Sequence, residues 1–331
     1  MSGSYKSRIQ EFNAALTEEK INLKALRELC FNGIPFEGGI RAQCWKLLLN
    51  YLPLERAVWD SFLKKQRELY TLFLKEMIIQ PGIAKANLGF SREDVTLHDH
   101  PLNPNPDSRW NSYFKDNEIL LQIDKDVRRL CPDISFFQSP TEHPCKLILD
   151  PQNDYETLRS RVEQTTLKAQ TVNRNRRGVT NVKHAEADTF FCFTNLMSEN
   201  RDNFIQTLDD SHCGITFRME SVYSTLKEKD AELYHKLQEQ NIKPQYFTFR
   251  WLTLLLSQEF LLPDVIRIWD TLFSNQDRFD FLILVCCAML ILIRDQLLRG
   301  DFTANMRLLQ DYPISDVHTI LRRATELQDG A

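Results

Sequence analysis

The sequence lacks three features: long hydrophobic runs, CxxC cysteine pairs, and an apolar stretch near its start. The most apolar run, residues 281–293, is shorter than the roughly 20 residues that a membrane-spanning helix needs, so we expect a buried core helix there. None of the eight cysteines forms a CxxC pair, which indicates reduced thiols in a core. Because no secretory signal is visible, we expect a cytoplasmic protein.

The usual signatures of self-contained enzymes are also missing. The sequence contains no GxxxxGK[ST] phosphate loop, no GxSxG elbow, no HExxH helix and no GxGxxG turn. One group of acidic residues and histidines resembles a metal-binding cluster: Asp94, His98, Asp99 and His100. No further His or Cys lies at the spacing of metal ligands, so a solvent-exposed loop is the favoured interpretation. We therefore expect neither a metal nor a cofactor, and a small-molecule enzyme is disfavoured.

A strong excess of charge of one sign is lacking too. The formal net charge of -4 argues against a protein that generally seeks nucleic acid or anionic lipid. Residues 156–183 form a local basic segment, but hardly any aromatic side chains interleave its arginines and lysines, whereas nucleic-acid binding needs stacking partners. A solvated linker or a fraying helix is the favoured interpretation of this segment, and no nucleic-acid partner is expected.

Helical periodicity, in contrast, is present almost everywhere. Apolar residues recur at spacings of three and four, while sustained alternation is missing. Pro263 and Asp264 open one helix, and only residues 146–149 resemble a strand, which cannot form a sheet alone. The predicted fold class is therefore all-α. A final amphipathic helix is predicted from Val317, Ile320, Leu321, Ala324 and Leu327.

The spacing of apolar residues over 117–130 predicts a helix whose polar side carries side chains suited to catalysis. Its apolar stripe consists of Leu120, Ile123, Val127 and Leu130. Helical geometry places Gln122, Asp126 and Arg129 together on the other side. Asp126 and Arg129 are three positions apart, so the carboxylate can hold the guanidinium in one pose. On helical geometry alone, an ordinary surface ion pair is the more common outcome.

Three groups of residues resemble a known family. Ile123, Asp126 and Arg129 match the IxxDxxR motif of the TBC domain, the fold of Rab GTPase-activating proteins. The upstream match consists of Gly33, Ile34, Pro35, Arg41 and Trp45, which resemble the family's GIP turn and the helix after it. The downstream match consists of Arg250, Trp251, Arg267, Trp269 and Asp270, which resemble its C-terminal signature. The matches follow the family's order along the chain.

The resemblance implies a multi-helix TBC-type fold in two helical halves. We expect N-terminal helices over residues 1–31, the first half over 32–155, a polar basic junction over 156–183 and the second half over 184–328. The resemblance also implies that the chain is not itself an enzyme. It would regulate hydrolysis by a Rab-family small GTPase in its GTP form, and the GTP and magnesium would belong to that partner.

The resemblance assigns roles to the three residues of the IxxDxxR motif. Arg129 is the arginine finger, Asp126 positions it, and Ile123 anchors the helix in the core. An arginine supplied in trans can raise GTP hydrolysis by about 10³ to 10⁵, because its planar, permanently charged guanidinium stabilises charge on the transferring phosphoryl group. Arg128 is then a neighbour of the finger.

One expected motif of the family is missing. In the family, the glutamine of a YxQG motif orients the attacking water, but no glutamine between Arg129 and residue 187 fits that pattern. We hypothesise that a helical segment is absent near residues 181–184, as an internal deletion or a splice variant would produce. Its loss would uncover the apolar faces of neighbouring helices and weaken catalysis more than binding.

Three functions fit these observations. The leading prediction is a Rab GTPase-activating protein in vesicle trafficking and intracellular protein transport, which visits vesicle or organelle membranes transiently through its lipid-anchored partner. The second is a Rab-binding module with impaired or no GTPase activation, because the glutamine finger is absent. The third is a helical scaffold protein with an architectural resemblance only. Phosphate release from a panel of Rab proteins, together with pull-downs of the GTP-loaded forms, separates the three.

Overall fold

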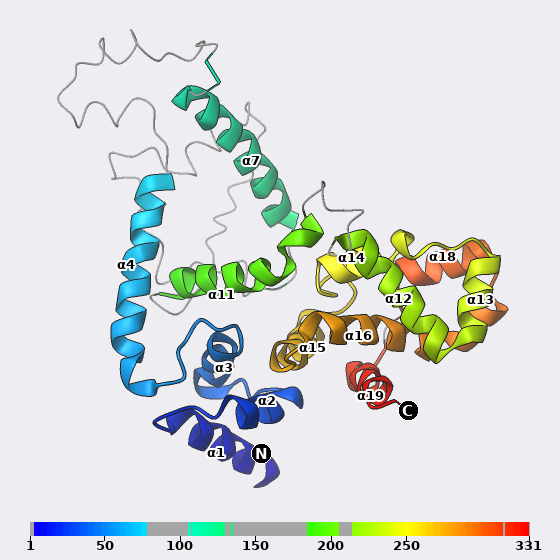
Figure 1. The fold of residues 1–331 in the computed structure, drawn as a ribbon, viewed down its shortest axis with the longest axis horizontal. Helices are drawn as coiled ribbons and strands as arrows, with labels where there is room; N and C mark the ends of the chain where they lie inside the picture. The colour runs from blue at the N-terminus through cyan, green and yellow to red at the C-terminus, as the bar shows by residue number, and fades with distance from the viewer. Residues whose placement is uncertain are drawn as a thin grey trace. The chain divides into compact units, whose positions relative to one another are not determined.

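The described part of the chain is built from helices (Figure 1). The structure is a computed structural model that describes residues 3–77, 105–106, 108–129, 134, 184–204, 214–313 and 315–330. Within these ranges there is no strand, and an isolated antiparallel bridge joins Lys20 and Glu55. The all-α prediction is therefore confirmed.

The helices fall into three stretches of the sequence. The first holds α1 (Gly3–Thr17), α2 (Leu23–Phe31), η1 (Glu37–Gly39), α3 (Ile40–Leu48), η2 (Arg56–Val58) and α4 (Trp59–Met77). The second holds α7 (Arg109–Arg129), α11 (Ala185–Asn200) and η3 (Arg201–Phe204). The third holds α12 (Ile215–Lys229), α13 (Ala231–Glu239), η5 (Pro244–Tyr246), α14 (Thr248–Thr253), α15 (Leu262–Ser274), α16 (Arg278–Leu292), α17 (Arg294–Arg299), α18 (Phe302–Gln310) and α19 (Val317–Gln328).

Helix α16 lies in the centre of the core. Most of its residues are buried, and it packs against α12, α15 and α19. A helix that is apolar on every side is stable only when neighbours surround it. Each fully buried Leu, Ile or Phe side chain contributes about 1.5–3 kcal/mol. The run 281–293 thus forms the core helix that the sequence predicts, and none of the described helices has the length and apolar character needed to span a membrane.

The cysteines agree with the prediction of reduced core thiols. Among the described residues, Cys30, Cys44, Cys286 and Cys287 are buried free thiols, while the thiol of Cys192 is only half-buried. Burial raises the pKa of Cys287 to about 12, which keeps this thiol protonated at neutral pH. These buried thiols behave as small apolar core residues rather than as nucleophiles.

The predicted C-terminal helix has the predicted buried face. In α19 the buried residues are Val317, Ile320, Leu321, Ala324 and Leu327. The carboxylate of Asp316 caps the helix, with Oδ1 accepting the backbone N–H of His318 at 3.1 Å. Side chains of Asn22, Asp230 and Asp301 cap α2, α13 and α18 in the same manner. Each such cap contributes about 1 kcal/mol, so local chemistry fixes where these helices begin.

The compact units of the chain do not follow two sequential halves. One unit joins the described residues of 1–62 with those of 191–331, and the other contains those of 63–190. The first unit is discontinuous because α2 and α3, near the N-terminus, pack against α15, which lies far later in the sequence. Both the GIP turn and the C-terminal signature therefore belong to the same unit.

Several sequence-based interpretations concern residues outside the described ranges. These are the strand-like residues 146–149, the basic segment 156–183 and the group Asp94, His98, Asp99 and His100. They stay predictions.

Candidate functional site

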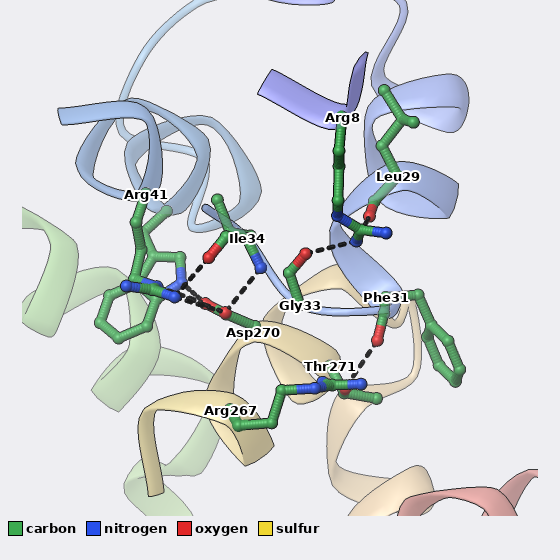
Figure 2. A network of polar contacts seen from close by, with 10 residues as sticks. Arg8, Leu29, Phe31, Gly33, Ile34, Arg41, Arg267, Asp270 and Thr271 are labelled. Carbon is green, nitrogen blue, oxygen red and sulfur yellow. Dashed lines mark hydrogen bonds and ion pairs between the residues drawn. The ribbon is translucent and has the colours of Figure 1, made fainter. Parts of the chain in front are cut away.

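A buried carboxylate, that of Asp270 in α15, connects segments that are far apart in the sequence (Figure 2). Its Oδ2 accepts the backbone N–H of Ile34 at 2.9 Å, and its Oδ1 accepts the indole N–H of Trp45 at 2.8 Å. The Arg41 guanidinium contacts both oxygens, with Nε 3.1 Å from Oδ1 and Nη2 3.2 Å from Oδ2. Because the Asp270 side chain is 0% exposed, its charge is tolerated only where such donors satisfy it.

Further hydrogen bonds hold the turn between α2 and α3. Arg8 of α1 donates from Nη2 to the carbonyl oxygens of Leu29, at 3.2 Å, and Gly33. The Thr271 hydroxyl of α15 donates to the carbonyl oxygen of Phe31 at 2.8 Å. Figure 2 shows that these contacts approach the turn from α1 and α15. The turn is therefore fixed by side chains from α1, near the N-terminus, and from α15, which lies much later in the sequence.

Arg267 packs directly against this turn. Its Nη1 donates to the Thr271 hydroxyl, while its Nε has no hydrogen-bond acceptor among the described residues. Burial lowers the pKa of the Arg267 guanidinium from its ordinary value, and the charge of Asp270 acts in the opposite direction. The close approach of Arg267 restricts which residue can occupy position 33.

Replacing Gly33 by alanine is expected to destabilise the protein by about 1–3 kcal/mol. The backbone of Gly33 has φ +91°, and an added Cβ would lie 3.0 Å from Nε and 3.1 Å from Cδ of Arg267. Urea unfolding measures the loss. Gly38→Ala is the matched control, since φ is +62° there and an added Cβ meets nothing within 4 Å, so only the backbone part of the loss should appear. Equal losses for the two variants would contradict the restriction by Arg267.

A second cluster contains the remaining residues of the C-terminal signature. Arg250 of α14 donates twice to the Glu259 carboxylate, at 2.5 Å from Nε and 2.8 Å from Nη2. The indole N–H of Trp269 donates to the carbonyl oxygen of Leu255 at 3.0 Å. Leu255 and Leu256 have φ +48° and +61°, a left-handed backbone that persists only where neighbours hold it. The ion pair and the indole together fix this loop.

Helix α7 carries the third group of motif residues. Gln122 donates from Nε2 to Oδ2 of Asp126 at 3.2 Å on the exposed side of the helix. Arg129 is the last residue of α7, and its side chain lies outside the described residues. The helix thus presents a carboxylate one turn before Arg129. The positioning of Arg129 by Asp126 stays a prediction.

Comparisons with known proteins decide the family. The chain is 64% identical to TBC1 domain family member 13 of Homo sapiens over 399 aligned positions that cover 100% of both chains. The chain belongs to the TBC domain family. The TBC domain-containing protein C1952.17c of Schizosaccharomyces pombe is 31% identical, over 98% of this chain and 73% of that protein.

The family model of the Rab-GTPase-TBC domain matches residues 178–298. Among solved structures, the crystal structure of the Ypt/Rab-GAP domain of Gyp1p is similar to this chain, with a TM-score of 0.62 and 26% identity over 98% of each chain. The TBC-type fold that the motifs predict is therefore confirmed.

The alignment with the human TBC relative also shows that this chain is shorter than the relative because internal positions are missing. It has 399 positions, whereas the chain has 331 residues, so at least 68 positions hold no residue of this chain. These positions are internal because the alignment covers both chains completely. The family model begins to match at residue 178, close to residues 181–184, where the sequence predicts a missing segment.

Most TBC signature residues stabilise the fold instead of forming an exposed surface. Each of the following is buried or half-buried: Gly33, Ile34, Pro35, Arg41, Trp45, Arg250, Trp251, Arg267, Trp269 and Asp270. The structure brings the GIP turn, Arg41 and Trp45 together around Asp270. Trp251 is 0% exposed and packs edge-on against Phe247, with 5.0 Å between ring centroids. We therefore interpret these residues as structural supports of the fold.

Ile123 is not the core anchor that the TBC motif predicts. Its side chain is 50% exposed, and Ile119, one turn earlier on the same face, is 59% exposed. Spacings of three and four identify an apolar stripe, but they do not tell which residues cover it. In the structure half of the Ile123 side chain is exposed to water, so the prediction is corrected.

Two ion pairs that hold α11 were not predicted from the sequence. The Asp188 carboxylate, 2% exposed, accepts hydrogen bonds from Arg67 at 3.0 Å and 2.9 Å. The buried Arg278 guanidinium places Nε 3.0 Å from Oε2 of Glu199 and donates from Nη2 to the carbonyl oxygen of Leu48 at 3.1 Å. An acid inside an apolar helix signalled the first pair, because a buried carboxylate needs a cation. No sequence signal marked the second pair.

Proposed function

We propose that this chain is a GTPase-activating protein for a Rab-family small GTPase in its GTP form, and that Arg129 is its arginine finger. The observation that carries the proposal is the 64% identity to TBC1 domain family member 13 along the whole chain. Further support comes from the likeness to Gyp1p, whose solved domain is named a Ypt/Rab-GAP domain. The chain would accelerate its partner's reaction, so GTP and magnesium belong to the partner.

The chemistry of α7 fits this role. Small GTPases hydrolyse GTP slowly because charge on the transferring phosphoryl group is poorly stabilised, and a guanidinium from a second protein supplies the missing stabilisation. Asp126 is exposed and accepts a hydrogen bond from Gln122. A carboxylate has about four acceptor sites, so Asp126 can also receive a donor from Arg129. Ile119 and Ile123 add exposed apolar surface for a protein partner on the preceding turns.

In this proposal the protein acts in vesicle trafficking and intracellular protein transport. It works from the cytoplasm and reaches vesicle or organelle membranes through its lipid-anchored Rab partner, so its own membrane contact is peripheral. No nucleic acid and no cofactor of its own take part.

A second candidate function is Rab binding without activation. The observation that favours it is the set of at least 68 alignment positions without a residue in this chain, together with the absent YxQG motif. Without a group that orients the attacking water, the arginine stabilises charge but leaves the water loosely held. Binding depends on the whole contact surface and is less sensitive to that loss.

Single-turnover phosphate release from a panel of GTP-loaded Rab proteins tests both functions. With the chain in excess, we expect at least one Rab to hydrolyse GTP about tenfold or more above its intrinsic rate, because an arginine finger alone can contribute far more. Pull-downs with the same Rab proteins in GTP and GDP forms run in parallel. Binding of the GTP form at an unchanged rate would select the second function, and neither signal would leave only a helical scaffold.

A further inference from the structure

Two arginines of the same compact unit have buried N–H groups without a hydrogen-bond acceptor. Arg278, the first residue of α16, is 5% exposed, and its Nε and Nη1 have no acceptor among the described residues. The Nε of Arg27 in α2 is also buried without an acceptor there. In the described part of the chain, seven buried side-chain nitrogen and oxygen atoms lack a partner, and three of them belong to these two arginines. Unsatisfied donors of charged groups are therefore concentrated at one place.

Arg27 and Arg278 lie near each other where α2 meets α16. Phe31 of α2 packs edge-on against Phe281 of α16, with 5.7 Å between ring centroids. Arg27 precedes Phe31 by four residues and Arg278 precedes Phe281 by three, so each arginine lies on the same helix face as its ring. Burial is the main cause that lowers the pKa of the Arg278 guanidinium, and the charge of Arg27 lowers this pKa as well. Two like charges thus act on each other where water is largely excluded.

The contacts of these two side chains leave one positive charge unbalanced. Arg278 donates from Nη2 to the carbonyl oxygen of Leu48 at 3.1 Å. Oε2 of Glu199 lies 3.0 Å from Nε of Arg278, but without the alignment of a hydrogen bond. Arg27 forms no ion pair with a described residue. Two guanidinium groups thus share one carboxylate, and a buried charged donor without an acceptor is costly.

We propose that Arg27 and Arg278 form a binding site for a small inorganic oxyanion of the phosphate and sulfate class. Such an ion offers several acceptor oxygens, so it can receive donors from both guanidinium groups at once. Its negative charge also balances the excess positive charge, which a water molecule does not do.

The burial of the surrounding side chains suits a free ion. The Glu199 side chain is 35% exposed and Arg27 is half-buried, so an ion can enter from this edge. Arg278 is buried more deeply, which disfavours a phosphate group that is attached to a macromolecule. The ion is held by the fold itself, so the inference does not depend on GTPase activation.

Thermal unfolding of the full chain in phosphate tests the proposal. The Tm is measured at one pH and one ionic strength, first in sodium chloride and then with about 20 mM inorganic phosphate in place of part of the chloride. We expect phosphate to raise the Tm by about 2 °C, because a ligand that binds only the folded state shifts the unfolding equilibrium. Sulfate should give a similar rise. Isothermal titration calorimetry with inorganic phosphate should show a single binding site.

Arg27→Gln is the variant that separates binding from a general salt effect. In chloride its Tm should equal or exceed that of the original chain, because the substitution removes a like charge beside Arg278. In phosphate the rise in Tm should fall to less than about a third. Lys24→Gln is the matched control, since Lys24 is an exposed cation of the same helix and its loss should leave the full rise.

Arg278→Lys tests the site from the other helix. The lysine keeps a positive charge beside Glu199 but lacks the planar guanidinium, so the affinity for phosphate should fall by about fivefold or more in calorimetry. Because the two variants alter different helices, each tests the site if the other does not fold.

Several results would overturn the proposal. Equal rises in the original chain, Arg27→Gln and Lys24→Gln would mean that phosphate stabilises the protein only through a general salt effect. No rise in Tm and no heat of binding would mean that water alone satisfies these donors. A rise with phosphoserine as large as that with inorganic phosphate would mean that the site admits the phosphate group of a larger molecule instead of a free ion.

Discussion

Replacing Asp270 by alanine is expected to lower the free energy of unfolding by about 3–5 kcal/mol. The substitution removes the acceptor of the Ile34 N–H and the Trp45 indole N–H, and each unsatisfied buried donor costs about 1–3 kcal/mol. Arg41 keeps 26% of its side chain exposed, so water solvates part of its charge and its share of the loss is smaller. The effect is large because three donor residues, in the turn and in α3, lose their common acceptor at once.

Urea unfolding, monitored by far-UV circular dichroism, measures this loss as a lower midpoint. Asp277→Ala is the control, because Asp277 is exposed and its carboxylate does not cap α16, so a change within about ±0.5 kcal/mol is expected. Asp270→Asn keeps the side-chain volume and should lose less, which provides a measurement if the alanine variant does not fold. An unchanged midpoint in both variants would show that Asp270 does not connect these segments.

A double substitution separates the ion pair from the rest of this network. Arg41→Met combined with Asp270→Ala leaves no uncompensated guanidinium near the turn. The double variant should therefore lose less stability than the sum of the two single losses, because each single variant leaves one charged partner behind.

Much of the fold could be predicted because burial follows local spacing. The five apolar residues assigned to α19 are all buried, and the run 281–293 occupies the centre of the core. Pro263 lies in the first turn of α15, as its rigid φ and missing N–H favour. These predictions need only one segment of sequence at a time.

What could not be predicted depends on segments that are distant in sequence. Spacing alone does not show that Trp45 and Ile34 share the carboxylate of Asp270, or that Arg278 pairs with Glu199. The family motif identified several of these residues without giving their contacts. Ile123 shows the same limit, since its place in the motif did not reveal that half of its surface is exposed.

Replacing Arg129 by alanine is expected to reduce Rab-stimulating activity by about 10³, or down to the intrinsic rate of the GTPase if the stimulation is smaller. The finger acts on charge that develops as the phosphoryl group transfers, so its loss appears in the rate of hydrolysis. Arg129→Lys should fall almost as far, because an ammonium is a point charge without the planar fork of donors. Single-turnover phosphate release with the most responsive Rab measures both variants.

Arg128→Ala is the control for local charge, since it removes the same side chain one position earlier and should leave the rate within about twofold of the original. Affinity for the GTP-loaded Rab should change less than tenfold in Arg129→Ala, because an interaction made in the transition state contributes little to ground-state binding. A full rate in Arg129→Ala, or an equal loss in Arg128→Ala, would contradict the assignment of the finger.

The role of Asp126 follows from the same chemistry, because a positioning residue acts only through the group that it positions. Asp126→Asn should lower the stimulated rate by about tenfold, as expected when a charge-assisted hydrogen bond to the guanidinium is lost. In the Arg129→Ala background the same substitution should have no further effect. A tenfold loss in both backgrounds would mean that Asp126 contacts the partner directly, since its carboxylate is exposed and already accepts a hydrogen bond from Gln122.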